Sequence, residues 1–250
     1  MIHSLLMAFS LYSRIPVPQV KWNEKSMRYC ICFLPLVGAV IGALQYLAFR
    51  LLAPVSAGKT LSGAVLAALP VLLSGGIHMD GFLDTCDAVH SYADREKRLE
   101  ILKDPHVGAF AVIGGILYFG LSMGIWSEAG SGEILTLCLL FPFSRALSAF
   151  SAVTFPKAKK DGMLRQETDP AAKGSAFAMA AVSVLTGAAL IGTGPVRGTA
   201  AVLASLAVLL YYRRMSCRLF GGTTGDLSGW FTQMCELMAA GAAVIASRLF

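Results

Sequence analysis

Residues 78–106 concentrate acidic and imidazole side chains in an otherwise apolar chain. The segment holds seven of the fifteen carboxylates and three of the four histidines of a protein that is 56% hydrophobic and 14% charged. Carboxylates at helical spacing repel one another unless a cation lies among them. The segment therefore predicts a metal site.

Asp80, Asp84 and Asp87 have the spacing i, i+4 and i+7, which places three carboxylates on one face of a helix. Mg²⁺ is typically held by one or two carboxylates together with substrate phosphates. Gly81 allows a phosphate or another backbone to approach this face. A solvated polar helix face is the alternative, and it explains the charge but not the convergence.

His78 precedes the first aspartate by two residues and is a candidate proton acceptor, phosphate donor or partner of a metal ligand. We take His78, Asp80 and Asp84 as the candidate catalytic residues. A transition metal bound by the same three residues is an alternative. It is disfavoured because neither an HExxH pattern nor a paired-cysteine pattern accompanies them.

Basic residues follow the aspartates at helical spacing. Arg95, Arg98 and Lys103 would supply cations to a pyrophosphate on the side that a metal does not cover. An ordinary salt-bridged helix is the competing interpretation. Asp104, just before Pro105, is either a helix cap or a further metal ligand.

A glycine-rich loop over residues 221–229 is the second candidate phosphate site. Gly222, Thr224 and Gly225 would present backbone N–H groups and a hydroxyl, and Asp226 would add a metal contact. A plain turn is the alternative. Arg14 begins an extended segment with prolines at 16 and 18, which disfavour helix.

Glu236 lies inside an apolar run, where a carboxylate costs about 2.5–3.5 kcal/mol on membrane-insertion scales. It therefore needs a partner. Arg145, inside another apolar run, is the candidate partner, or else a ligand for an anionic substrate group.

Apolar runs of about twenty residues, separated by basic loops, predict a single all-α integral membrane domain over residues 1–250. Residues 1–12 favour an amphipathic helix at the interface. The six cysteines lack CxxC spacing, which indicates free thiols. About seven transmembrane helices are expected, at 33–53, 61–77, 107–126, 133–154, 174–193, 197–212 and 231–249.

The basic residues divide unequally between the two sides of this topology. Three lie on one side, at Lys59, Arg197 and Arg248. Because cytoplasmic loops carry the excess of Lys and Arg, the acidic segment is expected to face the cytoplasm. The charge fits anionic headgroups better than nucleic acid. The other side has sixteen: Arg14, Lys21, Lys25, Arg28, Arg95, Lys97, Arg98, Lys103, Lys157, Lys159, Lys160, Arg165, Lys173, Arg213, Arg214 and Arg218.

Four motifs resemble the cobalamin synthase family, the adenosylcobinamide-GDP ribazoletransferases of prokaryotic membranes. They are the Arg14–Pro18 segment, Gly75–Asp87, Arg98–Asp104 with Gly108, and Gly221–Asp226. The chain differs mildly from the expected pattern at Ala88, Leu102 and Pro105. None of these three positions is acidic.

The resemblance implies a Mg²⁺-dependent reaction of adenosylcobinamide-GDP with α-ribazole or its 5′-phosphate, giving adenosylcobalamin or its phosphate and GMP. A ribose 5′-hydroxyl is the expected nucleophile, with Asp80, Asp84 or His78 taking its proton. The expected location is the cell membrane, with the lipid bilayer, other enzymes of the pathway or a second protomer as partners.

Two other functions compete with this one. CDP-alcohol phosphotransferases also displace a nucleoside monophosphate with spaced aspartates and Mg²⁺, but their DGxxAR pattern is absent because no Ala-Arg pair follows Gly81. A cation transporter is the non-enzyme alternative. Transporters usually place carboxylates at the bilayer midplane, whereas these lie at the end of an apolar run.

Overall fold

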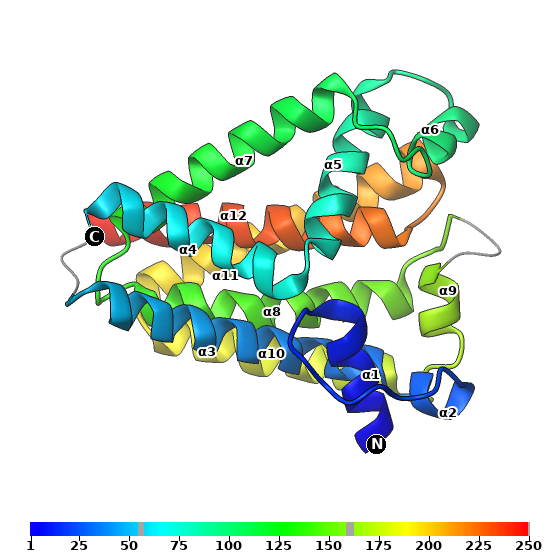
Figure 1. Ribbon diagram of the computed structural model, residues 1–250, viewed down its shortest axis with the longest axis horizontal. Coiled ribbons are helices and arrows are strands. Elements are labelled where there is room, and N and C mark those ends of the chain that lie inside the picture. Colours follow the sequence, from blue (N-terminus) through cyan, green and yellow to red (C-terminus); the bar gives the residue numbers. More distant parts are fainter. Residues whose placement is uncertain (55–57, 159–162, 250) are drawn as a thin grey trace.

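The computed structural model describes residues 1–54, 58–158 and 163–249 (Figure 1). Within these ranges the chain is helical, and its one β-bridge pairs Lys157 with Thr223. The elements are α1 (Ile2–Tyr12), α2 (Glu24–Met27), η1 (Ile31–Phe33), α3 (Leu34–Leu52), α4 (Lys59–Ser74), α5 (Ile77–His90), α6 (Arg95–Ile101), α7 (Ala109–Glu128), α8 (Ile134–Thr154), α9 (Met163–Thr168), α10 (Ser175–Gly192), α11 (Pro195–Met215), the π-helical η2 (Ser216–Phe220) and α12 (Gly225–Leu249).

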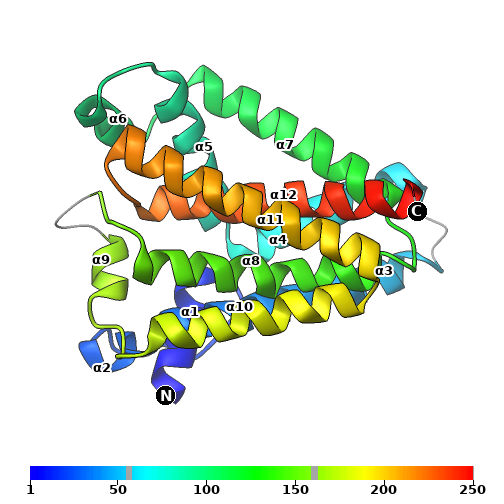
Figure 2. The ribbon, with the colours of Figure 1, turned by 180° about the vertical axis from the view of Figure 1, so that it is seen from behind.

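The long helices run side by side as a bundle, and the short helices α2, α6 and α9 lie at one end of it (Figures 1 and 2). We call this the basic end. The end of α3, the start of α4 and the turns that join α7 to α8 and α10 to α11 lie at the opposite end. In the part of the chain that is described, five segments are long and apolar enough to cross a membrane: Lys25–Leu52, Ala109–Glu128, Ile134–Thr154, Ser175–Gly192 and Pro195–Phe220. The protein is therefore a multi-pass membrane protein.

Helices α4 and α5 form a bent pair that would add a sixth crossing. Their axes differ by 99°, and the bend is made by Gly75 and Gly76, which have φ angles of 69° and 79°. Residues with a side chain rarely adopt such angles. Helix α5 therefore runs across the basic end of the bundle and does not continue the crossing made by α4.

Helix α12 occupies the place of the seventh predicted crossing. It packs against α5, α7, α8 and α11 and begins at Gly225, six residues before the predicted span. Helix α12 is not among the five apolar segments, because it contains buried polar residues such as Gln233 and Glu236. Because neighbouring helices cover it, this helix can carry polar groups that lipid would not accept.

Helix α8 is the most enclosed of the five apolar segments, because 83% of its most apolar 18-residue stretch is buried. Helix α3 packs closely on it at Gly38 and Gly42. A Cβ at either glycine would overlap the backbone carbonyl of Phe141 or Cys138. Small residues of this kind let membrane helices approach at backbone distance.

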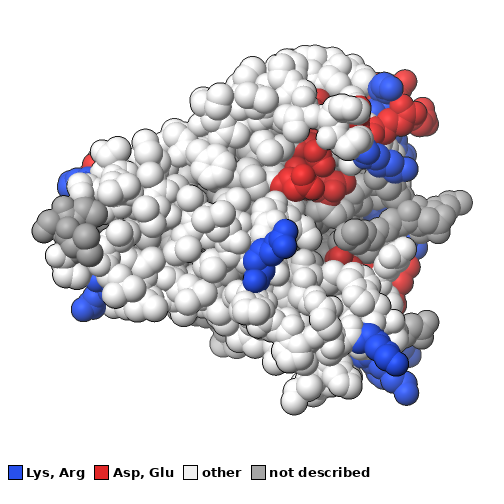
Figure 3. Space-filling view, in the orientation of Figure 1, with Lys and Arg blue, Asp and Glu red and all other residues white. Residues whose placement is uncertain are grey.

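The charged side chains in view lie mostly at the basic end, with a broad uncharged surface between the two ends (Figure 3). This distribution agrees with the unequal division of Lys and Arg in the sequence. Lys159 and Lys160, two of the sixteen basic residues assigned to this side, lie outside the described residues. Helix α1 forms as expected, with Met7 and Ala8 buried.

Candidate functional site

The acidic face of α5 meets the beginning of α12 at the basic end. A Cβ added to Gly81 would lie 2.5 Å from the carbonyl oxygen of Asp226, and one added to Gly229 would lie 2.9 Å from that of His78. The two helices therefore cross in backbone contact, which only glycine permits. Asp226, distant in sequence, is thereby placed beside the α5 aspartates.

Asp84 shows the electrostatic consequence of this crossing. Burial, and then the negative charges of Asp80, Asp226 and Asp87, raise the pKa of Asp84 to about 7. A cation among these carboxylates would relieve their repulsion. The donor set is therefore suited to a hard divalent ion.

The described part of the chain contains no group of three His, Cys, Asp or Glu side chains close enough to hold a metal ion as they stand. The five aspartates predicted as ligands therefore do not form one ready cluster. An ion at this position would need oxygen atoms from a substrate as well, which is common for Mg²⁺.

Two of the five predicted ligands have other contacts in the structure. The carboxylate of Asp87 accepts hydrogen bonds from the backbone N–H groups of Gly108 (2.7 Å) and Ala111 (2.9 Å), so it caps the start of α7. Asp104 accepts one from the backbone of His106 (3.0 Å) and lies 2.7 Å from the Nδ1 of that residue. Asp104 is not among the charges that act on Asp84. The strongest metal-ligand candidates are thus Asp80, Asp84 and Asp226.

The basic residues of α6 have different surroundings. The guanidinium of Arg95 lies directly against Gly221, where a Cβ would overlap it. Arg98 is 9% exposed, and among the described residues its Nε has no hydrogen-bond partner. Lys103 is exposed. Arg95 therefore lies at the glycine-rich loop. Arg98 is a buried cation that can still donate a hydrogen bond.

The glycine-rich loop is held by the segment after α8. The backbone of Thr223 donates to the carbonyl of Pro156 (2.7 Å) and accepts from the N–H of Ala158 (3.0 Å). A Cβ on Gly222 would lie 2.6 Å from the backbone of Lys157. Gly222 is thus required for close backbone packing, and nothing in its contacts points to a ligand.

The other two loop residues lie at the start of α12. Thr224 accepts a hydrogen bond from the backbone N–H of Leu227 (3.2 Å) and caps the helix. Gly225 has open space where a Cβ would stand, and it lines a cavity. Of the three predicted loop ligands, only Gly225 therefore borders free space.

This cavity has a volume of about 190 Å³ and lies between α1, α3, α5, α8, α9 and the start of α12. It contains residues predicted from the sequence together with two that sequence reasoning missed, Tyr12 and Glu167. No local motif marks either of them. Its polar lining consists of Tyr12, His78, Asp80, Ser148, Glu167, Asp226 and Ser228.

His78 is 7% exposed, and its Nε2 has no hydrogen-bond partner in the described part of the protein. Burial, followed by the charge of Arg145, lowers the pKa of His78 to about 3. The ring is therefore neutral near pH 7 and a weak base. This favours a hydrogen-bonding role for His78 and leaves proton transfer to the carboxylates.

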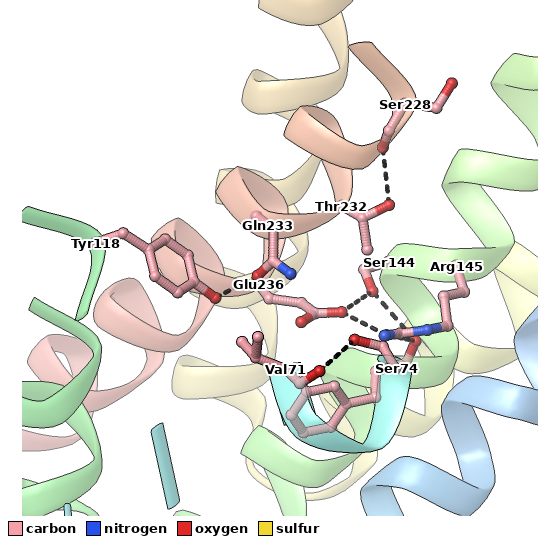
Figure 4. Close-up of polar contacts among 10 residues, drawn as sticks. Val71, Ser74, Tyr118, Ser144, Arg145, Ser228, Thr232, Gln233 and Glu236 are labelled. Carbon is pink, nitrogen blue, oxygen red and sulfur yellow. Dashed lines mark hydrogen bonds and ion pairs between the residues drawn. The ribbon is translucent and has the colours of Figure 1, made fainter. Parts of the chain in front are cut away.

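Arg145 and Glu236 form a buried ion pair between α8 and α12 (Figure 4). Nη1 of Arg145 lies 2.5 Å from Oε1 of Glu236, and the hydroxyl of Ser144 donates to the same oxygen at 2.7 Å. The hydroxyl of Tyr118 donates to Gln233 one turn away. The expected partner of Glu236 is confirmed, and the charge of Arg145 is compensated within the protein.

Arg14 contacts the bend between α4 and α5. Its backbone N–H donates to the carbonyl of Leu73 (2.8 Å), and a Cβ on Gly75 would lie 2.7 Å from its side-chain Cγ. The side chain is exposed. Arg14 therefore fastens the extended N-terminal segment over the start of α5.

The bundle and its polar end define a class: helical, multi-pass membrane proteins in which acidic and basic side chains from separate helices meet at one end. Comparison with known families makes this assignment specific. The family model described as cobalamin-5-phosphate synthase matches residues 4–244. The chain belongs to this family, as the sequence motifs indicated.

Curated relatives agree with this assignment. A protein of Lachnoclostridium phytofermentans named adenosylcobinamide-GDP ribazoletransferase is 44% identical over 98% of this chain and 94% of its own length. Proteins of the same name from Pseudomonas entomophila and Desulfitobacterium hafniense are 36% and 31% identical. They cover 86% and 95% of this chain, and 87% and 94% of their own lengths. No solved structure matches.

Proposed function

We propose that the protein is a Mg²⁺-dependent transferase that joins adenosylcobinamide-GDP to α-ribazole or its 5′-phosphate and releases GMP. The observation that carries this proposal is the meeting of Asp80, Asp84 and Asp226 where α5 crosses α12, within a chain that matches the family over nearly its whole length. The names of the relatives supply the substrates.

Mg²⁺ would be held by Asp80, Asp84 and Asp226 together with diphosphate oxygens of the donor. When bound, such an ion neutralises the charge that develops on the diphosphate as its bridge breaks. The raised pKa of Asp84 supports this assignment because it reflects burial together with the nearby charges of Asp80, Asp226 and Asp87.

In the proposed reaction, a hydroxyl oxygen of the acceptor forms a bond to the cobinamide-side phosphorus. The bond from that phosphorus to the bridging oxygen breaks, and its electron pair leaves with GMP. The hydroxyl proton passes to Asp80 or Asp84. Asp80 lines the cavity, and Asp84 lies one helical turn from it on the same face of α5.

The family description supports a different nucleophile from the expected 5′-hydroxyl. A cobalamin-5-phosphate product keeps a phosphate on the 5′-oxygen of the ribose. A 5′-hydroxyl nucleophile does not fit that product. We therefore assign the attack to another hydroxyl of the same ribose.

The remaining charge of the donor is assigned to two elements. Arg98 is buried, and its Nε has no hydrogen-bond partner among the described residues, so a phosphate would satisfy it; Arg95 lies against the loop that precedes α12. The second element is the start of α12, which lies beside Asp80 and Asp84 and where a helix favours negative charge. Lys103 and Arg14 are exposed and would act at longer range.

We place the site on the cytoplasmic side of a bacterial cell membrane, because the basic end of the bundle carries most of the Lys and Arg. Nucleotide substrates are made on that side. The other enzymes of the pathway and a second protomer are candidate partners. A CDP-alcohol transferase and a cation transporter have no comparable support from the family match.

The test is GMP release by the purified, lipid-reconstituted protein. Adenosylcobinamide-GDP is supplied with and without α-ribazole or its 5′-phosphate, first in Mg²⁺ and then in excess chelator. Release that requires both an acceptor and Mg²⁺ supports the proposal. Release without an acceptor would indicate a hydrolase. No release under any of these conditions would overturn the assignment.

A further inference from the structure

The cavity beside Asp80 is too small for a whole substrate. Its volume is about 190 Å³, whereas pockets that enclose complete small ligands are usually about 300–1,000 Å³. A corrinoid or an entire nucleotide therefore extends beyond it. The cavity fits one polar part of such a ligand.

The charges on its walls limit what that part can be. Asp80, Asp226 and Glu167 all border the cavity, and none of the described residues that line it is Lys or Arg. A phosphate cannot donate hydrogen bonds to carboxylates, and their negative charge repels it. A neutral group rich in hydroxyls meets no such repulsion and can donate hydrogen bonds to the carboxylates.

Glu167 is the unexplained member of this lining. It is 8% exposed, and its Oε2 accepts a hydrogen bond from the hydroxyl of Tyr12 at 2.8 Å. In the described ranges no donor is recorded for its Oε1. Burial raises the pKa of Glu167, and the bond from Tyr12 opposes this only in part. The carboxylate therefore retains hydrogen-bonding capacity on the cavity side.

His78 adds a second unsatisfied group. Its Nε2 is buried and unpaired among the described residues, and the side chain lines the same cavity. Buried polar atoms without partners are rare in proteins and call for a ligand or an ordered water. An unpaired ring nitrogen and a carboxylate on one cavity match a group that carries two neighbouring hydroxyls, because a hydroxyl can both donate and accept a hydrogen bond.

We propose that this cavity is a ribose subsite, in which Glu167, held in place by Tyr12, accepts hydrogen bonds from sugar hydroxyls. Carboxylates bind ribose hydroxyls in this way in nucleotide-binding folds. The inference rests on the proposed function, because both of its substrates contain a ribose: the acceptor in α-ribazole and the donor in its guanosine. The competing explanation is that Tyr12 and Glu167 only tie α1 to α9.

The experiment removes hydroxyls from the ligand and the acceptor oxygen from the protein. The probes are 2′-deoxy and 3′-deoxy α-ribazole, and a donor that carries 2′-deoxyguanosine. Whichever deoxy acceptor still reacts has lost a hydroxyl that only binds. For wild-type protein, one of these changes should lower kcat/KM by about 10- to 100-fold, the value of a hydrogen bond to a charged group.

Glu167→Gln keeps the shape of the side chain and the contact with Tyr12, but presents an N–H₂ group in place of a carboxylate oxygen. The variant should lower kcat/KM for the complete substrate and lose most of the discrimination against the deoxy analogue. Asp169→Asn is the matched control, since Asp169 lies two residues away, is 54% exposed and pairs with Lys157. It should behave as wild type.

The outcomes separate the possibilities. Discrimination lost only toward the acceptor analogues assigns the cavity to the acceptor ribose, and discrimination lost only toward the donor analogue assigns it to guanosine. Discrimination unchanged in Glu167→Gln overturns the subsite and leaves a structural tie. Equilibrium binding of α-ribazole and of GMP to both proteins repeats the comparison without turnover. It therefore still tests the subsite if the transferase reaction itself is not observed.

Discussion

Gly81 of α5 lies against the backbone of Asp226 in α12, so closely that a Cβ would stand 2.5 Å from the carbonyl oxygen of Asp226. This contact sets the separation of two segments that are 145 positions apart. Asp226 lies beside the acidic face of α5 because the two helices cross at this distance. Gly81 is thus a structural requirement for the site, although it has no side chain to contribute.

Gly81→Ala should push α5 away from α12 and separate Asp80 and Asp84 from Asp226. We expect a loss of about 1–3 kcal/mol in stability, as for other overpacked positions, and a larger loss of transferase activity. Gly120→Ala is the control, because a Cβ there meets nothing within 4 Å. Melting temperature in detergent and GMP release measure the two effects. Full activity in Gly81→Ala would show that the crossing distance is unimportant.

Asp84→Asn should remove the response of the protein to Mg²⁺. With GDP present as a source of diphosphate, Mg²⁺ should raise the melting temperature of wild type. At a Mg²⁺ concentration of about 100 times Kd, binding should stabilise the folded protein by about 2.7 kcal/mol. The variant should not respond, and without Mg²⁺ it should melt no lower than wild type, because one repelling charge has been removed.

Asp104→Asn is the matched comparison for Asp84→Asn. Its carboxylate is exposed and contacts His106, and it should retain the full Mg²⁺ response. An equal loss of the Mg²⁺ response in the two variants would indicate that Asp104 is also a metal ligand. A full response in Asp84→Asn would refute the metal assignment.

The Arg145–Glu236 pair predicts a different behaviour. Breaking the pair with Arg145→Met or Glu236→Leu leaves one buried charge uncompensated, which should cost about 3–5 kcal/mol. The double variant should recover most of the loss, since an apolar pair suits this buried position. Thermal denaturation of the four proteins forms a double-mutant cycle. Activity in the recovered double variant would exclude a role for Arg145 in substrate binding, whereas a stable but inactive protein would support one.

The orientation in the membrane can be measured with a native cysteine. Cys217 is exposed and lies in η2 at the basic end. If this end is cytoplasmic, a membrane-impermeant thiol reagent should not label Cys217 in intact cells and should label it after permeabilisation. Ser131→Cys, at the opposite end of the bundle, should be labelled in intact cells when combined with Cys217→Ala. The reverse pattern would invert the topology.

Hydropathy predicted the long helices well because the side of a helix that faces lipid must be apolar along the whole length of the helix. Predicted spans 33–53 and 133–154 correspond to Leu34–Leu52 and Ile134–Thr154. The start of α12 was predicted six residues too late. Its first turns carry polar groups that pack against other helices, and hydropathy alone cannot distinguish such groups from a loop.

The candidate site was predicted in part. Asp80, Asp84 and His78 share a helix, so local spacing was enough to group them, and Asp226 was found through its glycine-rich surroundings. The capping role of Asp87 depends on the fold around Gly108. Glu167 meets Tyr12 across 155 residues. Contacts of this kind have no local pattern, so only the folded structure reveals them.

The length of α4 sets how deep in the membrane the aspartates lie. With 16 residues, α4 covers about 24 Å, less than the roughly 30 Å thickness of the hydrocarbon layer. If α4 starts at one boundary of that layer, its end at Gly75 lies within about 6 Å of the other boundary. Substrates of the proposed reaction would then have to approach the membrane surface closely, and adding one helical turn to α4 would move the α5 aspartates away from it by about 5 Å.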